Sequence, residues 1–171
     1  LTTFGRSESQ LAQQLDSLTL PENVTIGYRS ASPVIEIKLN GPAEQESAML
    51  SIWQKIKTVA DKNTLYEGIN SLPQVIAGLL KEKSLSIAVW EQFTAGLVSL
   101  QLSNAEAPMR GGQYLTADLE LSLNDLSKLA LKTRLDYGSD IALAVGNKAL
   151  QHIDLALATP DIAYVMRFHY N

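Results

Sequence analysis

The sequence predicts two small domains, an α+β domain over residues 1–68 and a three-layer α/β/α domain over residues 72–171. Two observations predict these classes. The hydrophobic pattern of residues 1–68 predicts the element order β-α-β-β-α-β, whereas the pattern of the later residues predicts helices alternating with strands. Turn residues between Gly68 and Pro73 separate the two patterns, and we expect the domain boundary there.

The first domain opens with a strand and a short helix. Residues 1–4 are strand-like. Ser7 and Gln10 have the spacing of a capping box, in which the serine hydroxyl accepts from a first-turn amide and the glutamine side chain reaches back. Three leucines then recur on one helix face until Pro21, which ends the helix because proline lacks an amide hydrogen.

Two strands, a long helix and a last strand complete this domain. Apolar and polar residues alternate over 24–29 and 35–39, which predicts two half-buried strands joined by a turn. Apolar residues at helical spacing predict an amphipathic helix over about 43–61. Residues 64–67 are typical of a short strand.

The second domain begins with a helix from Pro73. A nearly continuous apolar run over 85–90 follows, as expected of a strand covered on both faces. The pattern then predicts a helix over about 94–102. The pair Gly111-Gly112 is expected to break the chain before a strand near 113–115.

A helix, a buried strand and a hairpin end the sequence. The helix is predicted between residues 124 and 135, with Gly138 as its stop. Residues 141–145 read as a buried strand. A hairpin is predicted from two apolar segments, 153–158 and 162–168, that flank a Thr-Pro-Asp turn.

Both ends of the sequence look cut from a longer protein. Position 1 is Leu rather than Met, and the last strand-like segment stops at Asn171 without a closing helix. We therefore expect the second domain to be truncated at its C-terminus. An apolar sheet face left uncovered near residues 162–170 predicts self-association or a partner there.

Composition excludes several classes of protein. The chain is 46% hydrophobic with a net charge of −4, and it has no stretch near the ~20 apolar residues of a bilayer span. We expect a cytoplasmic protein without membrane contact. The absence of cysteine excludes disulfides, a thiol nucleophile and a zinc–thiolate site. Phosphate-loop, dinucleotide, serine-hydrolase and zinc-protease patterns are missing, so we expect no cofactor.

The two histidines, His152 and His169, fall on opposite strands of the predicted hairpin. Metal binding there requires a carboxylate such as Asp154 to point the same way. Two ordinary strand histidines are the favoured interpretation, and no metal site is predicted.

The most informative segment spans residues 85–98. A buried strand passes into a helix through a turn that carries Glu91, Thr94 and the small pair Ala95-Gly96. Such a turn places polar groups and free amides at a helix N-terminus, where α/β proteins bind anions. In the structural alternative, Thr94 is a plain N-cap and the small pair serves close packing.

This segment resembles the strand-turn-helix of the CinA C-terminal domain, which in active members reads A-E-S-C-T-G-G-L. Four residues match that pattern: Glu91, Thr94, Gly96 and Leu97. Residues 3–11 resemble the F/Y-G-x-x-E-S-x-L opening of the KH-like middle domain of CinA proteins, and its next two strands resemble residues 26–28 and 35–39. The resemblance covers most of the chain.

The resemblance implies an activity and its loss. Active C-terminal domains of this family are nicotinamide-nucleotide amidases, which hydrolyse nicotinamide mononucleotide to nicotinate mononucleotide and ammonia with the serine of the E-S-C-T-G-G turn as nucleophile. That position holds Gln92, whose amide cannot be deprotonated to attack a carbonyl. The tyrosine and lysine of the family's Y-S-N-E-A-K stretch fall near Thr116 and Leu121, although a shift brings Tyr114 closer.

A fourth family element, the T-G-I-A-G-P loop, is replaced by residues 145–149. We therefore predict a catalytically inactive CinA-like protein. Its vestigial pocket consists of Glu91, Gln92, Thr94, Ala95 and Gly96, with a pyridine nucleotide as the expected ligand.

Two alternatives stay open. One is an amidohydrolase that acts through substitute residues such as Glu91 with Thr94. The other is a nucleotide- or nucleic-acid-binding module, which the balanced charges and the missing G-x-x-G loop of KH domains disfavour. The resemblance also implies an N-terminal domain of the molybdopterin-binding type, further C-terminal helices and a homo-oligomeric complete protein.

Overall fold

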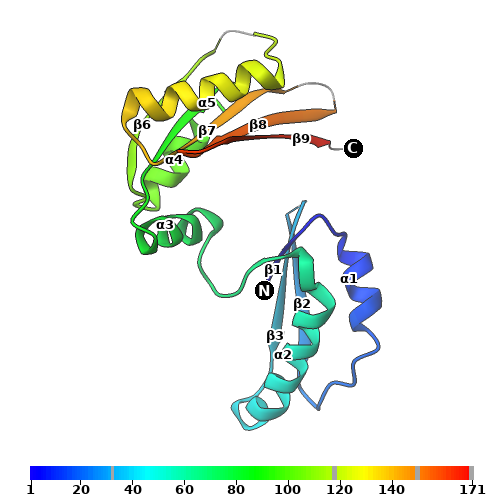
Figure 1. Ribbon diagram of the computed structural model, residues 1–171. Helices are drawn as coiled ribbons and strands as arrows, with labels where there is room; N and C mark the ends of the chain where they lie inside the picture. Colours follow the sequence, from blue (N-terminus) through cyan, green and yellow to red (C-terminus); the bar gives the residue numbers. More distant parts are fainter. Residues whose placement is uncertain (32, 117–118, 149–150, 170–171) are drawn as a thin grey trace. The chain divides into compact units, whose positions relative to one another are not determined.

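The computed structural model describes residues 1–31, 33–116, 119–148 and 151–169 (Figure 1). The chain divides into two compact units, Leu1–Ile69 and Asn70–Asn171. Each unit contains one sheet, with four strands in the first and five in the second. Within the described residues, no helix is both long and apolar enough to cross a membrane.

The first unit has the predicted order β-α-β-β-α-β. Its elements are β1 (Thr2–Phe4), α1 (Glu8–Leu15), β2 (Thr25–Ala31), β3 (Val34–Asn40), the 3-10 turn η1 (Ala43–Gln45), α2 (Glu46–Ala60), the 3-10 turn η2 (Asp61–Asn63) and β4 (Thr64–Tyr66). The strands pair in the antiparallel order β2-β3-β1-β4. Side chains of both helices and of β3 form one apolar core, in which Leu11, Ile37 and Ile56 are fully buried.

The start of helix α1 agrees with the sequence prediction, whereas its end does not. The capping box of Ser7 and Gln10 is present. The helix ends at Leu15, however, and not near Pro21. The chain tightens there because the amide of Leu18 donates to the carbonyl of Leu15, three residues back, at 2.9 Å. Leu18 still packs against the core from outside the helix.

The second unit alternates helices and strands before a final antiparallel hairpin. Its elements are α3 (Leu72–Glu82), β5 (Ile87–Glu91), α4 (Leu97–Asn104), β6 (Met109–Tyr114), α5 (Leu123–Tyr137), β7 (Ile141–Lys148), β8 (His152–Ala158) and β9 (Ala163–His169). The strand order is β6-β5-β7-β8-β9. Strand β5 runs parallel to β6 and β7, and the β7–β8 and β8–β9 pairs are antiparallel.

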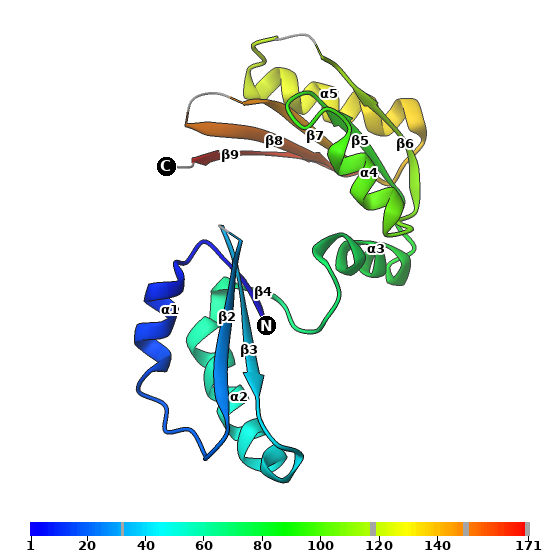
Figure 2. The ribbon, with the colours of Figure 1, turned by 180° about the vertical axis from the view of Figure 1, so that it is seen from behind.

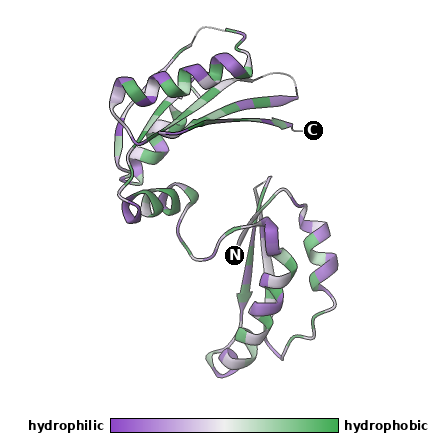
Figure 3. Ribbon diagram, viewed as in Figure 1, coloured by the Kyte–Doolittle hydropathy of each residue, from purple (hydrophilic) through white to green (hydrophobic). Residues whose placement is uncertain are grey.

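Helices cover both faces of this sheet, which confirms the predicted three-layer arrangement. Leu126 and Ala130 of α5 pack with Trp90 on one face. On the other face, Leu80 of α3 and Leu102 of α4 pack with the remaining side of β5. Figures 1 and 2 show α5 and α4 on opposite sides of the sheet, and Figure 3 shows hydrophobic and hydrophilic residues alternating along α5.

The prediction that Gly111 and Gly112 break the chain before a strand is wrong, because both lie inside β6. A Cβ on Gly111 would lie 2.4 Å from the ring of Tyr137 in α5. A Cβ on Gly112 would lie 2.9 Å from the Ser99 hydroxyl in α4. The two glycines therefore allow a helix to approach each face of the strand closely.

The hairpin of β8 and β9 carries the predicted uncovered apolar face. Residues on its α5 side, such as Ala156 and Ala158, are buried. The opposite side presents three cross-strand pairs: Ile153 with Phe168, Leu155 with Met166, and Leu157 with Tyr164. Tyr164 and Met166 are more than half exposed. Whether a second copy or a partner covers this face stays a prediction.

Replacing Ile56 with alanine should destabilise the first unit, because this fully buried side chain of α2 would leave a cavity in the core. We expect the free energy of unfolding to fall by about 2–5 kcal/mol. The matched control is L50A on the same helix, where the side chain is 57% exposed and the change should stay within about 0.5 kcal/mol. Urea denaturation followed by Trp53 fluorescence in a W90F background measures both; equal losses would contradict the assigned core.

Candidate functional site

A buried carboxylate organises the turn between β5 and α4. The side chain of Glu91, the last residue of β5, is 0% exposed. One oxygen accepts hydrogen bonds from the hydroxyl of Thr94 at 2.6 Å and the amide of Val98 at 2.9 Å. The other accepts from the hydroxyl of Ser99 at 2.6 Å and its amide at 2.9 Å. Each carboxylate oxygen therefore has two donors.

These contacts set the charge of the group. Burial raises the pKa of Glu91, but the hydrogen bonds from Ser99, Thr94 and Val98 outweigh it and hold the pKa below its ordinary value of 4.5. The side chain is ionised at neutral pH. An ionised group with a lowered pKa is a good acceptor and a weak base.

The start of α4 differs from its prediction. The helix begins at Leu97, three residues later than expected, because Ala95 and Gly96 have left-handed backbones with φ of 49° and 92°. Thr94 is not its N-cap, since its hydroxyl donates to Glu91. The predicted free amides of the first helical turn are not all free either. The amides of Val98 and Ser99 are bound by Glu91, which takes the place of an external anion.

Gln92 is the residue that the resemblance aligns with the family nucleophile. In the structure it makes structural contacts. It is buried, and its side-chain nitrogen donates to the carbonyl of Leu119 at 3.0 Å. Its backbone amide donates to the carbonyl of Val145 in β7 at 3.0 Å. The side chain thus connects the end of β5 to the segment that precedes α5.

Thr116 and Leu121, which we expect near the positions of the family's tyrosine and lysine, have different surroundings. Leu121 packs against the apolar cluster beneath α5, and Thr116 is exposed after β6. Tyr114 instead pairs in register with Glu91 across β5 and β6. Its ring lies 3.6 Å from where a Cβ on Gly96 would be. The structure therefore brings Tyr114 to the turn, as the shifted alignment allows.

Residues 145–148, which the resemblance aligns with the T-G-I-A-G-P loop, continue strand β7. This strand extends to Lys148, and the carbonyl of Gly146 accepts from the amide of Phe93 at 3.4 Å. A Cβ on Gly146 would lie 3.2 Å from the backbone oxygen of Asp154. The last position of the predicted replacement, Ala149, lies outside the described residues.

A cavity of about 360 Å³ lies beside the turn. Gly96, Ser99, Arg110 and Tyr114 are among its lining residues. It therefore combines a guanidinium, an aromatic ring and a hydroxyl next to α4. The sequence indicates a structural role for Ser99. It did not predict the contact with Glu91, because the two residues are eight positions apart.

Replacing Glu91 with glutamine should destabilise the second unit, because an amide nitrogen would face hydroxyl and amide donors. Hydrogen bonds to charged groups contribute about 1.5–3 kcal/mol each, so we expect a loss of about 3 kcal/mol at neutral pH. Since the folded pKa is lowered, the carboxylate's contribution is fully present above 4.5 and is lost as the pH falls through the folded value. Urea denaturation followed by Trp90 fluorescence in a W53F background tests this; a pH-independent difference between E91Q and its parent would contradict it.

Replacing Ala95 with glycine should stabilise the second unit by about 0.5–1 kcal/mol, because glycine relieves the left-handed strain and loses part of that gain in chain entropy. The matched control is A105G at the C-cap residue that follows α4, where φ is −84°. There the same substitution should lower stability by about 0.5–1 kcal/mol. Thermal unfolding of both variants gives the signs; destabilisation by A95G would refute the strained turn.

Comparison with solved structures identifies the fold. A CinA superfamily protein from Enterobacter cloacae matches with a TM-score of 0.51 at 14% identity, over 63% of this chain and 84% of that chain. A CinA superfamily protein from Escherichia coli matches with a TM-score of 0.52 at 12% identity, over 65% of this chain and 85% of that chain. At these identities the likeness concerns the fold alone.

Comparison of sequences identifies the family, although no family model matches the chain. The CinA-like protein of Escherichia coli strain SMS-3-5 is 43% identical over 171 residues, which is 100% of this chain and 42% of that protein. The CinA-like protein of Shigella flexneri is 42% identical over the same shares. This chain spans less than half the length of these curated relatives. Similar to them in sequence over its whole length, and similar in fold to CinA superfamily structures, the chain belongs to the family of CinA-like proteins.

Proposed function

We propose that the second unit is a catalytically inactive relative of the nicotinamide-nucleotide amidases, with a retained pocket for a pyridine nucleotide. Gln92 carries this proposal, because it stands where the family pattern has the nucleophilic serine. Its amide is buried and donates to the carbonyl of Leu119, and an amide offers no nucleophile.

An amidohydrolase that acts through Glu91 with Thr94 or Ser99 is the alternative. Both hydroxyls lie 2.6 Å from the carboxylate, which is the distance between a nucleophile and its base. The lowered pKa of Glu91 argues against this function, because the carboxylate accepts a proton poorly at neutral pH. All four donors would also have to rearrange.

The volume and lining of the cavity beside the turn suit a small anionic ligand with an aromatic ring. Its volume of about 360 Å³ is within the usual range of small-molecule sites. Arg110 suits a phosphate, and the ring of Tyr114 suits stacking on a pyridine. Because Glu91 occupies two amides of α4, Arg110 is the group proposed to bind the phosphate in their place.

Nucleic-acid binding by the first unit is the weaker alternative. Arg29 and Lys38 both approach the carboxylate of Glu36, at 3.8 and 3.9 Å. The guanidinium of Arg6 donates to the carbonyl of Val59 and the side chain of Gln14. These cations are therefore partly neutralised or engaged within the unit, which leaves little positive surface for phosphates.

The assay is formation of nicotinate mononucleotide from nicotinamide mononucleotide, with the longest natural protein that carries these residues. We expect no turnover above the uncatalysed rate, because loss of a nucleophile costs several orders of magnitude. An amidase that retains the E-S-C-T-G-G serine serves as the positive control.

Two variants distinguish the alternative if turnover is found. T94V and S99A remove one hydroxyl each while keeping a similar volume. Turnover by the parent protein that either substitution abolishes would establish substitute chemistry at Glu91 and refute the inactive assignment. Turnover that both variants keep would refute it as well and place the reaction elsewhere.

A further inference from the structure

The two histidines of the chain form a cross-strand pair on the last hairpin. His152 of β8 and His169 of β9 are directly opposite in the antiparallel register. Their ring centroids are 5.9 Å apart and the ring planes are tilted by 55°. This pair lies at the end of the hairpin away from its connecting turn, where Ala158 pairs with Ala163.

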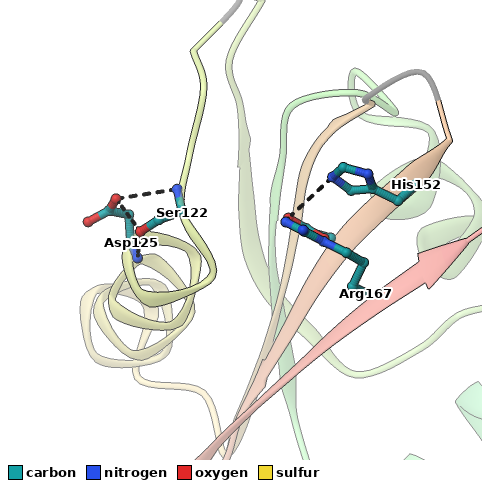
Figure 4. A network of polar contacts seen from close by, with 5 residues as sticks. Ser122, Asp125, His152 and Arg167 are labelled. Atoms are coloured by element: carbon teal, nitrogen blue, oxygen red, sulfur yellow. Dashed lines mark hydrogen bonds and ion pairs between the residues drawn. The ribbon is translucent and has the colours of Figure 1, made fainter.

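A carboxylate lies on the same face as the two histidines, where an arginine engages it. Asp154 is two residues along β8, and its Oδ2 atom is 3.9 Å from Nε2 of His152. Both of its oxygens accept from the guanidinium of Arg167, each at 2.7 Å. The Asp154 carboxylate and the Arg167 guanidinium therefore form an ion pair. Figure 4 shows His152 and Arg167 side by side, with the dashed contact from the His152 ring ending next to the Arg167 guanidinium.

We propose that His152 and His169 bind one divalent transition-metal ion between β8 and β9. Metal–nitrogen bonds of about 2.0–2.1 Å hold the centroids of two coordinating imidazoles roughly 5–6.5 Å apart, a range that includes the observed separation. Imidazole favours zinc, copper and nickel, with copper bound most strongly. The remaining coordination positions belong to water.

The surrounding side chains determine the number of protein ligands and the charge near the ion. In the described part of the chain, no group of three or more His, Cys, Asp or Glu side chains is placed to hold a metal, which agrees with the engagement of Asp154 by Arg167. The site therefore has two protein ligands. The Asp154 carboxylate also offsets the charge of Arg167, so the ion does not face an uncompensated cation.

The amino-acid composition makes metal binding at this site easy to distinguish from binding at other imidazoles or at thiolates. The sequence has two histidines and no cysteine, so both of its imidazoles are in this pair and it has no thiolate. A metal held by both residues would connect β9 to β8 at the open end of the hairpin. Binding to the folded state alone would then stabilise the strand by mass action.

The experiment is calorimetric titration of tag-free, chelator-treated protein with Cu²⁺ and Zn²⁺. We expect one ion per chain and slower hydrogen exchange of β9 in its presence. H152A and H169A should each weaken binding by about 100-fold, because a chelating pair becomes a single ligand. F168A is the matched control on the same strand, with its side chain on the opposite face, and should keep the parent affinity.

The copper complex gives a second readout. Its electron paramagnetic resonance spectrum should show two equivalent nitrogen donors in the parent and one in either histidine variant. Absence of saturable binding at millimolar metal would overturn the proposal. So would equal affinities of the parent, H152A and H169A, since the ion would then be bound by other groups.

Discussion

The second unit depends on the requirement that a buried charge be fully hydrogen-bonded. Glu91 is inaccessible to water at the end of a central strand, so donors must come from the chain itself. Thr94, Val98 and Ser99 supply them, which brings the start of α4 against β5. The left-handed turn before α4 and the missing side chain of Gly112 are the local conditions for this approach.

The predictions from sequence succeeded where the determining contacts are local. The capping box at Ser7 and the stop at Gly138 depend on residues within one helical turn, and both are present. The predictions failed where the structure depends on contacts between residues that are distant in the sequence. The role of Gly111 depends on Tyr137 of α5, and the occupied amides of α4 depend on a carboxylate seven and eight positions earlier. Neither contact can be recognised from the pattern of a short stretch of sequence.

The same distinction applies to the candidate site. The sequence predicts a vestigial pocket that includes Glu91, Thr94 and Gly96. In the structure Thr94 donates to Glu91, and Gly96 directly precedes the helix whose amides Glu91 binds. The sequence could not predict that this carboxylate caps the helix internally. Nor could it predict that Gln92 connects to Leu119, because that contact depends on how the segment before α5 returns to the sheet. Gln92, which the resemblance aligns with the nucleophile, is here a buried side chain hydrogen-bonded to that segment.

The outer strand of the second sheet has a consequence for the solubility of folding intermediates. Strand β9 is last in the strand order, so its outer edge has no partner strand within the described chain. Its seven residues include two aromatic side chains and no proline, a composition that favours intermolecular strand pairing. Arg167 interrupts the apolar run and is fixed by Asp154. Because charged residues within apolar edge strands oppose intermolecular strand pairing, we expect Arg167 to limit edge-to-edge aggregation.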